Sequence, residues 1–303
     1  MSEPISAILD QFDLSRAFTL PESLLKGLEL EGEANQQEDG LAFQKLLDLL
    51  KHSPVLLLQS LMAIKQEFPE ANLTTLEQES AKKIIFEQIR SSATQYNPLL
   101  QSQAQDNFSL LNWRHAVLSS KYISALAKSC KLPCSINLEA TALLTNLGEL
   151  IMVSVYSKDY FILYTKTSSE TELSRLEQHA FGVTHAELGA SFIERNELSS
   201  IDSDAIRFHH RPFEDIEDAT TAVKLCWLAN QLASKEDIDF DLINAGQKLF
   251  LLEQETLRAI KKTTSENLQG HMELLQIEIS ISKRLPLPEK AGITNRAEKK
   301  RHC

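Results

Sequence analysis

Four histidines in the middle third of the chain have the residue type that binds transition metals. They are His115, His185, His209 and His210. Neutral imidazole is a good ligand for zinc and iron, so histidines that a fold brings together can hold such an ion. Glu187 lies two residues after His185 and is a further candidate ligand of a histidine-rich site. Metal-dependent hydrolysis, in which the ion activates a water molecule, is the chemistry that such a site would support.

The same histidines also have a structural interpretation. A neutral imidazole carries one donor and one acceptor nitrogen, so it serves readily as a hydrogen-bonding group in a protein core. We favour this interpretation, with His185 and one member of the adjacent pair buried and hydrogen-bonded and the other member exposed. Three further polar positions in this region are Thr145, Asn146 and Asn230, and together with the histidines they form a candidate pocket for a small ligand.

Helices must position these residues, because the composition favours helix throughout. The chain of 303 residues has only 9 glycines and 9 prolines, and it is rich in leucine, alanine, glutamate, glutamine and lysine. These residue types keep their side-chain freedom in a helix. Alternating runs of valine, isoleucine and threonine, which would indicate strands, are missing. We therefore predict an all-α protein.

Local signals mark several helix ends. They are a cap followed by proline at Ser53-Pro54, capping boxes at Thr74–Glu77 and Thr184–Glu187, an N-cap at Asn137 and a C-terminal glycine at Gly182. With the spacing of apolar residues, they predict helices over residues 41–51, 54–68, 74–89, 109–131, 137–151, 156–164, 171–181, 184–193, 200–210 and 219–234. Weaker patterns follow at 241–250, 253–268 and 271–285.

The patterns divide the chain into five parts. We expect a poorly patterned segment at 1–40, an N-terminal helical subdomain at 41–107, a helical core at 108–235, C-terminal helices at 236–285 and a basic, disordered tail at 286–303. The subdomain ends in a polar connector near 101–107. We take the tail as a solvated end, with salt-sensitive RNA binding or membrane-surface contact as the alternative.

Charge and cysteine content exclude several classes of protein. The formal net charge of -11 argues against general nucleic-acid binding. The start Met-Ser-Glu-Pro lacks the pattern of a secretory signal, and no uncharged apolar stretch approaches the ~20 residues that span a bilayer. The four cysteines, Cys130, Cys134, Cys226 and Cys303, show no disulfide framework. We expect a soluble cytoplasmic protein with no membrane partner.

The polar positions fall in five segments with a fixed order. These are Asn112-Trp-Arg-His115, Leu143-Leu-Thr-Asn-Leu-Gly148, Gly182-Val-Thr-His-Ala-Glu-Leu-Gly189, Ile206-Arg-Phe-His-His-Arg-Pro212 and Leu225-Cys-Trp-Leu-Ala-Asn230. The order resembles the HDOD domain, a relative of the HD metal-dependent phosphohydrolases. The resemblance covers residues 108–233 well and residues 41–89 more loosely. It implies an HD-like helical core with an N-terminal helical subdomain.

The resemblance also implies which residues would bind metal in an active relative. HD enzymes place a His, a later His-Asp pair and a final Asp around one or two divalent ions. Here His115 matches the first histidine, Thr145-Asn146 replaces the His-Asp pair and Asn230 replaces the final Asp. Threonine and asparagine are weak ligands without charge. We therefore expect a degenerate cleft with no catalytic residue, no metal and no cofactor.

A non-enzymatic regulatory module is the function that these substitutions favour. HDOD proteins often accompany cyclic-di-nucleotide or phosphorelay signalling domains, so we expect a protein partner in such a pathway. A small ligand in the degenerate cleft, or in a groove between the two helical subdomains, is a further candidate. The alternative is a metal-dependent phosphohydrolase with a rearranged site built from the four histidines. The oligomeric state is left open.

Overall fold

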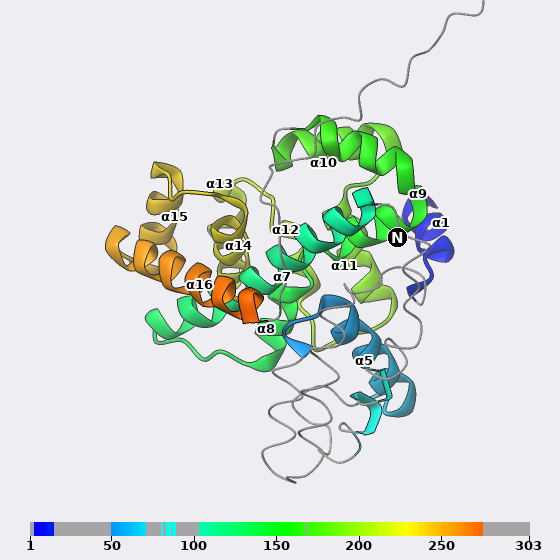
Figure 1. Ribbon diagram of the computed structural model, residues 1–303, viewed down its shortest axis with the longest axis horizontal. Helices are drawn as coiled ribbons and strands as arrows, with labels where there is room; N and C mark the ends of the chain where they lie inside the picture. The colour runs from blue at the N-terminus through cyan, green and yellow to red at the C-terminus, as the bar shows by residue number, and fades with distance from the viewer. Residues whose placement is uncertain are drawn as a thin grey trace, which may run out of the picture.

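All regular structure in the part of the chain that is described is helical (Figure 1). The computed structural model describes residues 3–14, 50–70, 80, 83–85, 87–88, 103–167 and 169–274. Its helices are α1 (Glu3–Gln11), α5 (Pro54–Glu67), α7 (Gln103–Ser129), α8 (Ile136–Leu143), α9 (Leu147–Lys166), α10 (Glu170–Phe181), α11 (His185–Arg195), α12 (Ser203–Phe208), α13 (Phe213–Ile216), α14 (Thr221–Ser234), α15 (Phe240–Phe250) and α16 (Gln254–Leu274). The prediction of an all-α fold is confirmed.

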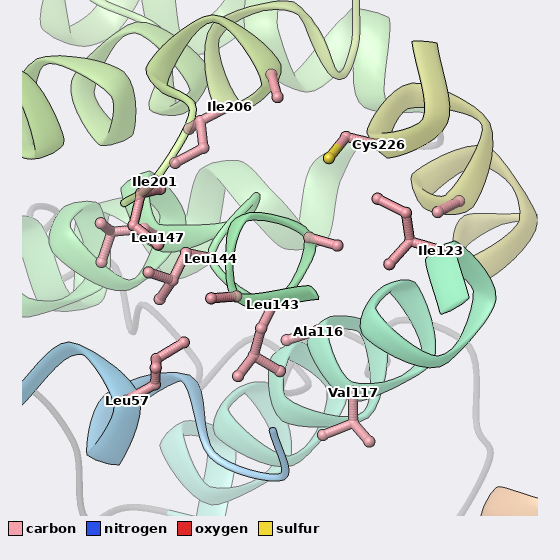
Figure 2. Packing of buried hydrophobic residues seen from close by; sticks show 14 of the residues in the cluster. Leu57, Ala116, Val117, Ile123, Leu143, Leu144, Leu147, Ile201, Ile206 and Cys226 are labelled. Atoms are coloured by element: carbon pink, nitrogen blue, oxygen red, sulfur yellow. The ribbon is translucent and has the colours of Figure 1, made fainter. Parts of the chain in front are cut away.

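The long helix α7 runs through the middle of the molecule and packs along α14, with α8 and α16 also against it (Figure 1). Apolar side chains from these helices meet in one core, part of which is shown in Figure 2. Val117 and Ile123 of α7 and Cys226 of α14 are completely buried there. The end of the segment before α5 joins this core, because Trp113 Nε1 donates a hydrogen bond to the His52 carbonyl at 2.5 Å.

Helices α9 and α11 approach each other unusually closely, and glycines permit it. A Cβ atom on Gly148 would lie 1.7 Å from the His185 carbonyl oxygen, a backbone atom that no rotamer change can move. A Cβ atom on Gly189 would lie 3.0 Å from the Gly148 nitrogen. The close contact places the first residue of α11 directly against the first turn of α9. The absence of a side chain at these two glycines therefore allows the start of α11 to lie in this position.

Three of the predicted helix ends are confirmed. Ser53 caps α5, with Pro54 in the first turn. Thr184 and Glu187 form the predicted capping box of α11. Gly182 ends α10 in the left-handed conformation, with φ 73°. Each of these signals acts through a hydrogen bond or a backbone angle within a few residues, so sequence alone can identify it.

Other predicted ends were wrong. Ser135 rather than Asn137 caps α8. The separate helix predicted at 156–164 is the second half of α9, joined to the first half at a kink where Ser157 has φ 42° and ψ -112°. Helix α7 begins at Gln103, inside the predicted connector, and α12 covers only Ser203–Phe208. The predicted break between 268 and 271 is absent, because α16 continues to Leu274.

The first helix was missed in a segment that showed little pattern. Ile8 and Leu9 of α1 are buried, and Phe12 meets Phe192 of α11 edge to face at 5.5 Å between ring centroids. An ion pair between Asp10 and Arg195, at 2.6 Å, holds the same two segments together. Ile5, Ile8, Leu9 and Phe12 pack on the core at helical spacing, but this pattern covers only about two turns and was overlooked.

The C-terminal helices pack on the core. Lys261 of α16 donates hydrogen bonds to the carbonyl oxygens of Leu232 at 2.8 Å and Lys235 at 2.6 Å, at the end of α14. The Tyr122 hydroxyl of α7 meets Ser265 Oγ at 2.8 Å. A cation at the C-terminus of α14 is favourable, because the last carbonyls of a helix lack partners within it.

One stretch within the described residues is long and apolar enough to cross a membrane, namely Ile136–Lys166. Of its most apolar window, 78% is buried inside the protein. The apolar side chains are therefore explained by the packing of α8 and α9 in the core. The helices predicted at 41–51 and 74–89, the helix predicted at 271–285 beyond Leu274, and the basic tail lie wholly or largely outside the described residues.

We predict that Gly148→Ala destabilises the protein by about 3 kcal/mol or more, since overpacking of this kind costs about 1–3 kcal/mol even where side chains can yield. Urea unfolding followed by circular dichroism measures the effect. Gly246→Ala is the matched control, because its Cβ would meet the end of the flexible Leu257 side chain at 2.6 Å. Equal unfolding midpoints for the two variants would contradict the close approach of α9 and α11.

Candidate functional site

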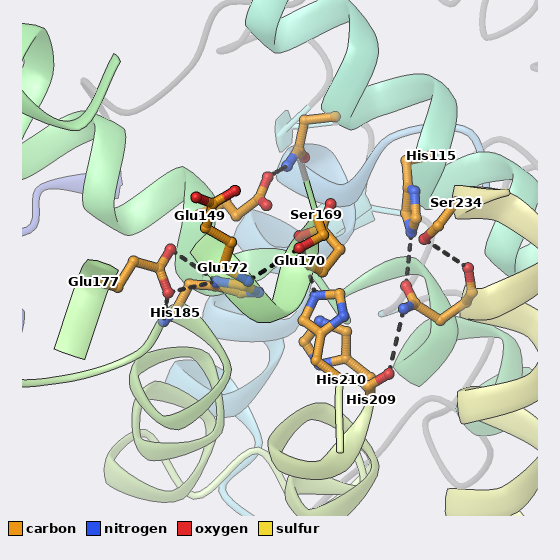
Figure 3. A network of polar contacts seen from close by, with 12 residues as sticks. His115, Glu149, Ser169, Glu170, Glu172, Glu177, His185, His209, His210 and Ser234 are labelled. Atoms are coloured by element: carbon orange, nitrogen blue, oxygen red, sulfur yellow. Dashed lines mark hydrogen bonds and ion pairs between the residues drawn. The ribbon is translucent and has the colours of Figure 1, made fainter. Parts of the chain in front are cut away.

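A chain of hydrogen bonds joins α7, α14 and the end of α12. His115 Nε2 lies 2.6 Å from Asn230 Oδ1, and Asn230 Nδ2 donates to the His209 carbonyl at 3.4 Å (Figure 3). The carbonyl can only accept, so it sets the orientation of the amide. Asn230 Oδ1 then accepts the proton of His115 Nε2. That nitrogen therefore has no lone pair free for a metal ion.

A second network surrounds the first residue of α11. His185 Nδ1 lies 2.8 Å from Glu177 Oε2, and the His185 backbone nitrogen donates to the same oxygen at 2.9 Å. The Tyr160 hydroxyl donates to Glu177 Oε1 at 2.7 Å. All three side chains are completely buried. The carboxylate thus fixes the imidazole ring and leaves its Nε2 pointing away from Glu177.

Three imidazole rings gather where α11 begins and α12 ends (Figure 3). One ring nitrogen from each of His185, His209 and His210 lies within 4.8 Å of the others. The rings of His209 and His210 are 3.8 Å apart between centroids. His209 Nδ1 donates to the Ile206 carbonyl at 2.5 Å. The Nε2 atom of each ring is buried and has no hydrogen-bond partner among the described residues.

Two acidic side chains border this cluster. Glu170, the first residue of α10, has its Oε2 3.7 Å from His210 Nε2. Glu149 of α9 is buried, and Asn112 Nδ2 donates to its Oε2 at 3.0 Å. Figure 3 shows Glu149 on the same side of the network as His185.

Burial sets the charge of most of these groups. Burial, with a smaller contribution from the charge of His185, holds the pKa of His209 and His210 well below the ordinary value. Burial also raises the pKa of Glu149 to about 8. For His185 burial opposes the charge, but Glu177 outweighs it and raises the pKa to about 9. At neutral pH the site therefore holds one buried ion pair, two neutral imidazoles and a protonated carboxyl group.

The seven predicted positions do not form one cluster of contacts. Hydrogen bonds link His115, Asn230 and His209, and ring contacts link His209 to His185 and His210. The remaining two positions, Thr145 and Asn146, are not linked to this group by a hydrogen bond within the described residues.

Thr145 is buried and its Oγ1 donates to the Ala142 carbonyl at 3.0 Å. Asn146 is the N-cap residue of α9 and makes no side-chain capping bond. Glu187 accepts from the Thr184 backbone in the capping box, so it does not take part in a histidine site. The expected exposure of one histidine of the pair was wrong, because only 8% of the His210 side chain is exposed.

Sequence reasoning missed the carboxylates that organise the site. Glu177 lies four residues after Leu173, and both are completely buried, so the glutamate occupies the apolar face of α10. Glu149 interrupts the apolar run from Leu147 to Val153. An acidic residue at an apolar position is seldom buried without a partner. The location of these two glutamates among apolar residues was the sequence signal for buried carboxylates with polar partners.

Comparison with known proteins gives one family match and several similar structures. Residues 82–212 match the family model of the HDOD domain. The fold is similar to that of the MmoQ response regulator from Methylococcus capsulatus, with a TM-score of 0.60 and 14% identity over 80% of this chain and 98% of that chain. No curated protein matches.

Two further solved structures are similar at a TM-score of 0.46. A putative phosphohydrolase from Shewanella amazonensis has 15% identity and covers 91% of this chain and 98% of its own. An HDOD domain protein with unknown function from Geobacter sulfurreducens has 14% identity and covers 92% of this chain and 98% of its own.

We predict that Glu149→Gln makes the stability of the protein less dependent on pH. The pKa of Glu149 is raised from 4.5 to about 8, so the folded state keeps a proton that the unfolded state loses. The contribution of this group therefore falls as pH rises from 4.5 through about 8. Glutamine stays neutral and still accepts from Asn112.

Urea unfolding at pH 6, 7 and 8, in buffer with a chelator, measures this difference. The free energy of unfolding of the wild type should fall relative to that of Glu149→Gln by up to about 3 kcal/mol over these two pH units. Glu255→Gln, at an exposed position of α16, should follow the wild type. A constant difference between Glu149→Gln and the wild type across this range would show that Glu149 is ionised in the folded protein.

Proposed function

We propose that the protein is a non-enzymatic signalling module that binds a protein partner, because residues 82–212 match the family model of the HDOD domain. One observation carries the proposal. At three of the four positions that correspond to the metal ligands of an HD enzyme, namely His115, Thr145 and Asn230, the side chain forms a hydrogen bond within the protein.

The contact between His115 and Asn230 shows the replacement most clearly. An aspartate at 230 would present two acceptor oxygens and repel the His209 carbonyl, whereas the asparagine amide donates to that carbonyl at 3.4 Å and accepts from His115 at 2.6 Å. The amide therefore satisfies both neighbours without an ion. Since Asn230 is completely buried, unsatisfied partners would be costly.

The two residues at the position of the His-Asp pair are also weak metal ligands. The Thr145 hydroxyl donates to a backbone carbonyl, and Asn146 carries no charge to offset that of a divalent ion. The residues present therefore do not fit the metal centre of an HD phosphohydrolase. The alternative enzyme, built from the four histidines, would lose His115 as a ligand, because its Nε2 bonds to Asn230.

A groove on another face of the core is a candidate site for a small anionic ligand. It has a volume of about 970 Å³ and lies where residues 51–52 meet α7, Glu139 and α16. Lys51, Lys121 and Lys128 line it, with several serine and threonine hydroxyl groups and one carboxylate. Lys51 pairs with Glu139 at 2.6 Å, so Lys121 and Lys128 supply the local positive charge, in a chain of net charge -11, that favours an anion at this face.

We predict that the purified full chain does not hydrolyse phosphoesters. The assay uses bis(p-nitrophenyl) phosphate and a cyclic dinucleotide, each with manganese, iron(II) or zinc. His115→Ala and the exposed-histidine variant His179→Ala are assayed beside the wild type. Turnover that His115→Ala abolishes and His179→Ala retains would overturn the non-enzymatic function, and turnover that all three share would identify a contaminating phosphatase.

We also predict that the groove binds a cyclic dinucleotide and that Lys128→Ala weakens binding about tenfold, because a lysine contact to phosphate is lost. Isothermal titration calorimetry measures the affinity. Lys158→Ala, at an exposed position of α9, is the matched control. Equal affinities in the two variants, or no binding by the wild type, would remove the groove as the ligand site.

A further inference from the structure

We propose that the outer face of α15 binds the same face of a second copy of this chain, with the two helices antiparallel about a two-fold axis. The outer face consists of Phe240, Asn244, Gln247 and Leu251. This contact between two copies goes beyond the proposed function and does not rest on it.

The first argument is the exposure of two apolar side chains. Among the described residues, Phe240 and Leu251 are the most exposed large apolar residues, at 79% and 80%. Single exposed apolar residues are normal on a protein surface, but these two lie at the two ends of one helix. Helix α15 is near the left edge of the molecule in Figure 1, with its inner side against α14 and α16. Its outer side is therefore open to a partner.

The spacing of the four residues places them on one side of the helix. Positions 240, 244, 247 and 251 follow the alternation of four and three residues that marks one helix face. Leu242, Ala245 and Gly246 lie on the opposite side and are buried. Asn244 and Gln247 are exposed and uncharged. The outer face therefore has two apolar ends with two amides between them, and it carries no charge that a partner must desolvate.

The second argument is the backbone of Leu251. This residue follows the last residue of α15 with φ 57° and ψ 29°, in the left-handed region that glycine commonly occupies at a helix end. Such a conformation is unfavourable for a leucine. Because most of the side chain is exposed, packing within the chain does little to offset this cost. Contact with a second chain gives a physical reason for a large apolar residue at this position.

The outer face is complementary to itself when two copies are antiparallel. A two-fold axis midway along α15 brings Phe240 of one copy opposite Leu251 of the partner subunit. It also brings Asn244 opposite Gln247 of the partner subunit, where the two amides can exchange hydrogen bonds. Each contact then occurs twice, as a two-fold interface requires.

The third argument is that the charges beside the outer face match in the same arrangement. Asp241 and Lys248 are seven residues apart on one flank of α15, and both are exposed. Lys248 also lies 3.7 Å from Glu217 of its own chain. In the antiparallel pair, Asp241 lies opposite Lys248 of the partner subunit, and the reciprocal pair forms on the same flank. Opposite charges therefore meet, which favours this orientation.

The other flank of α15 supports the same orientation. It carries the half-buried apolar residues Ile243 and Phe250. In the antiparallel pair this flank meets itself, so that Ile243 lies beside Phe250 of the partner subunit. A parallel pair would instead place the flank of Asp241 and Lys248 against these apolar side chains. Both flanks thus select the antiparallel pair.

One helix face from each copy is a small interface. Specific interfaces below ~1,200 Å² of total buried surface are typical of weak or transient association. We therefore expect a reversible equilibrium between monomer and dimer, with a dissociation constant in the micromolar range.

Sedimentation velocity of the untagged full chain at a series of concentrations measures the association. The expected result is a monomer–dimer equilibrium that Phe240→Asp weakens about tenfold or more, because it buries a charge against an apolar side chain. Ile162→Asp, at an exposed apolar position of α9, is the matched control and should associate as the wild type does. Circular dichroism checks that each variant folds.

Leu251→Gly separates a role in the interface from a role in the fold. Glycine adopts the left-handed conformation without strain, so the melting temperature of the dilute, monomeric protein should stay the same or rise. The same variant should weaken association about tenfold. A leucine that serves only the fold of its own chain would show the reverse, with a lower melting temperature and unchanged association.

Charge reversal tests the orientation. Asp241→Lys or Lys248→Glu alone places like charges at both pairs of the dimer, so each variant should associate more weakly than the wild type. An equimolar mixture of the two variants restores opposite charges at both pairs. The mixture should therefore associate more strongly than either variant alone, which a fluorescent label on one of them makes visible.

A full chain that remains monomeric at every concentration would overturn the inference, as would a dimer that Phe240→Asp and Leu251→Gly both retain. A mixture of the charge variants that associates no better than each alone would overturn the antiparallel orientation. Phosphoester turnover and cyclic-dinucleotide binding are separate readouts. Failure of the proposed function in those assays leaves the contact between two copies standing.

Discussion

The buried ion pair between Glu177 and His185 constrains the arrangement of the elements around it. Neither side chain is exposed, so each charge needs its partner and further hydrogen bonds to be tolerated in the core. Glu177 satisfies the backbone nitrogen and the ring of His185 together and also accepts from Tyr160. Three helices, α9, α10 and α11, are thereby held at one point. The glycine contact at Gly148 allows the backbones to approach closely enough for this bond to form.

Fixing His185 determines what the rest of the site can do. Its charge lowers the pKa of the neighbouring His209 and His210, which burial already lowers. The two rings are therefore neutral and have lone pairs available. On the opposite side of the cluster, Asn230 and His115 satisfy each other. The molecule thus combines a closed polar network around Asn230 with three imidazole Nε2 atoms that have no hydrogen-bond partner among the described residues.

This combination reconciles the two interpretations of the histidines. The structural interpretation holds for the Nδ1 atoms of His185 and His209, which make the hydrogen bonds of buried histidines. The ligand interpretation concerns the Nε2 atoms, which make none. In each of these two rings Nδ1 is thus hydrogen-bonded, whereas Nε2 has no partner among the described residues.

Residue types and their local spacing are enough to predict the helical class, the capping signals at Ser53, Thr184 and Gly182, and the polar positions that mark the site. These features depend on residue type and on contacts within one or two turns, which a linear pattern contains. The pairing of His115 with Asn230, the bond from Glu177 to His185 and the packing of α1 on the core became known only from the packed helices. Such contacts join residues far apart in the chain. The pattern of helices does not by itself determine which of these distant residues meet. The charge of each group in the site depends on its burial, and burial is known only once the helices are packed.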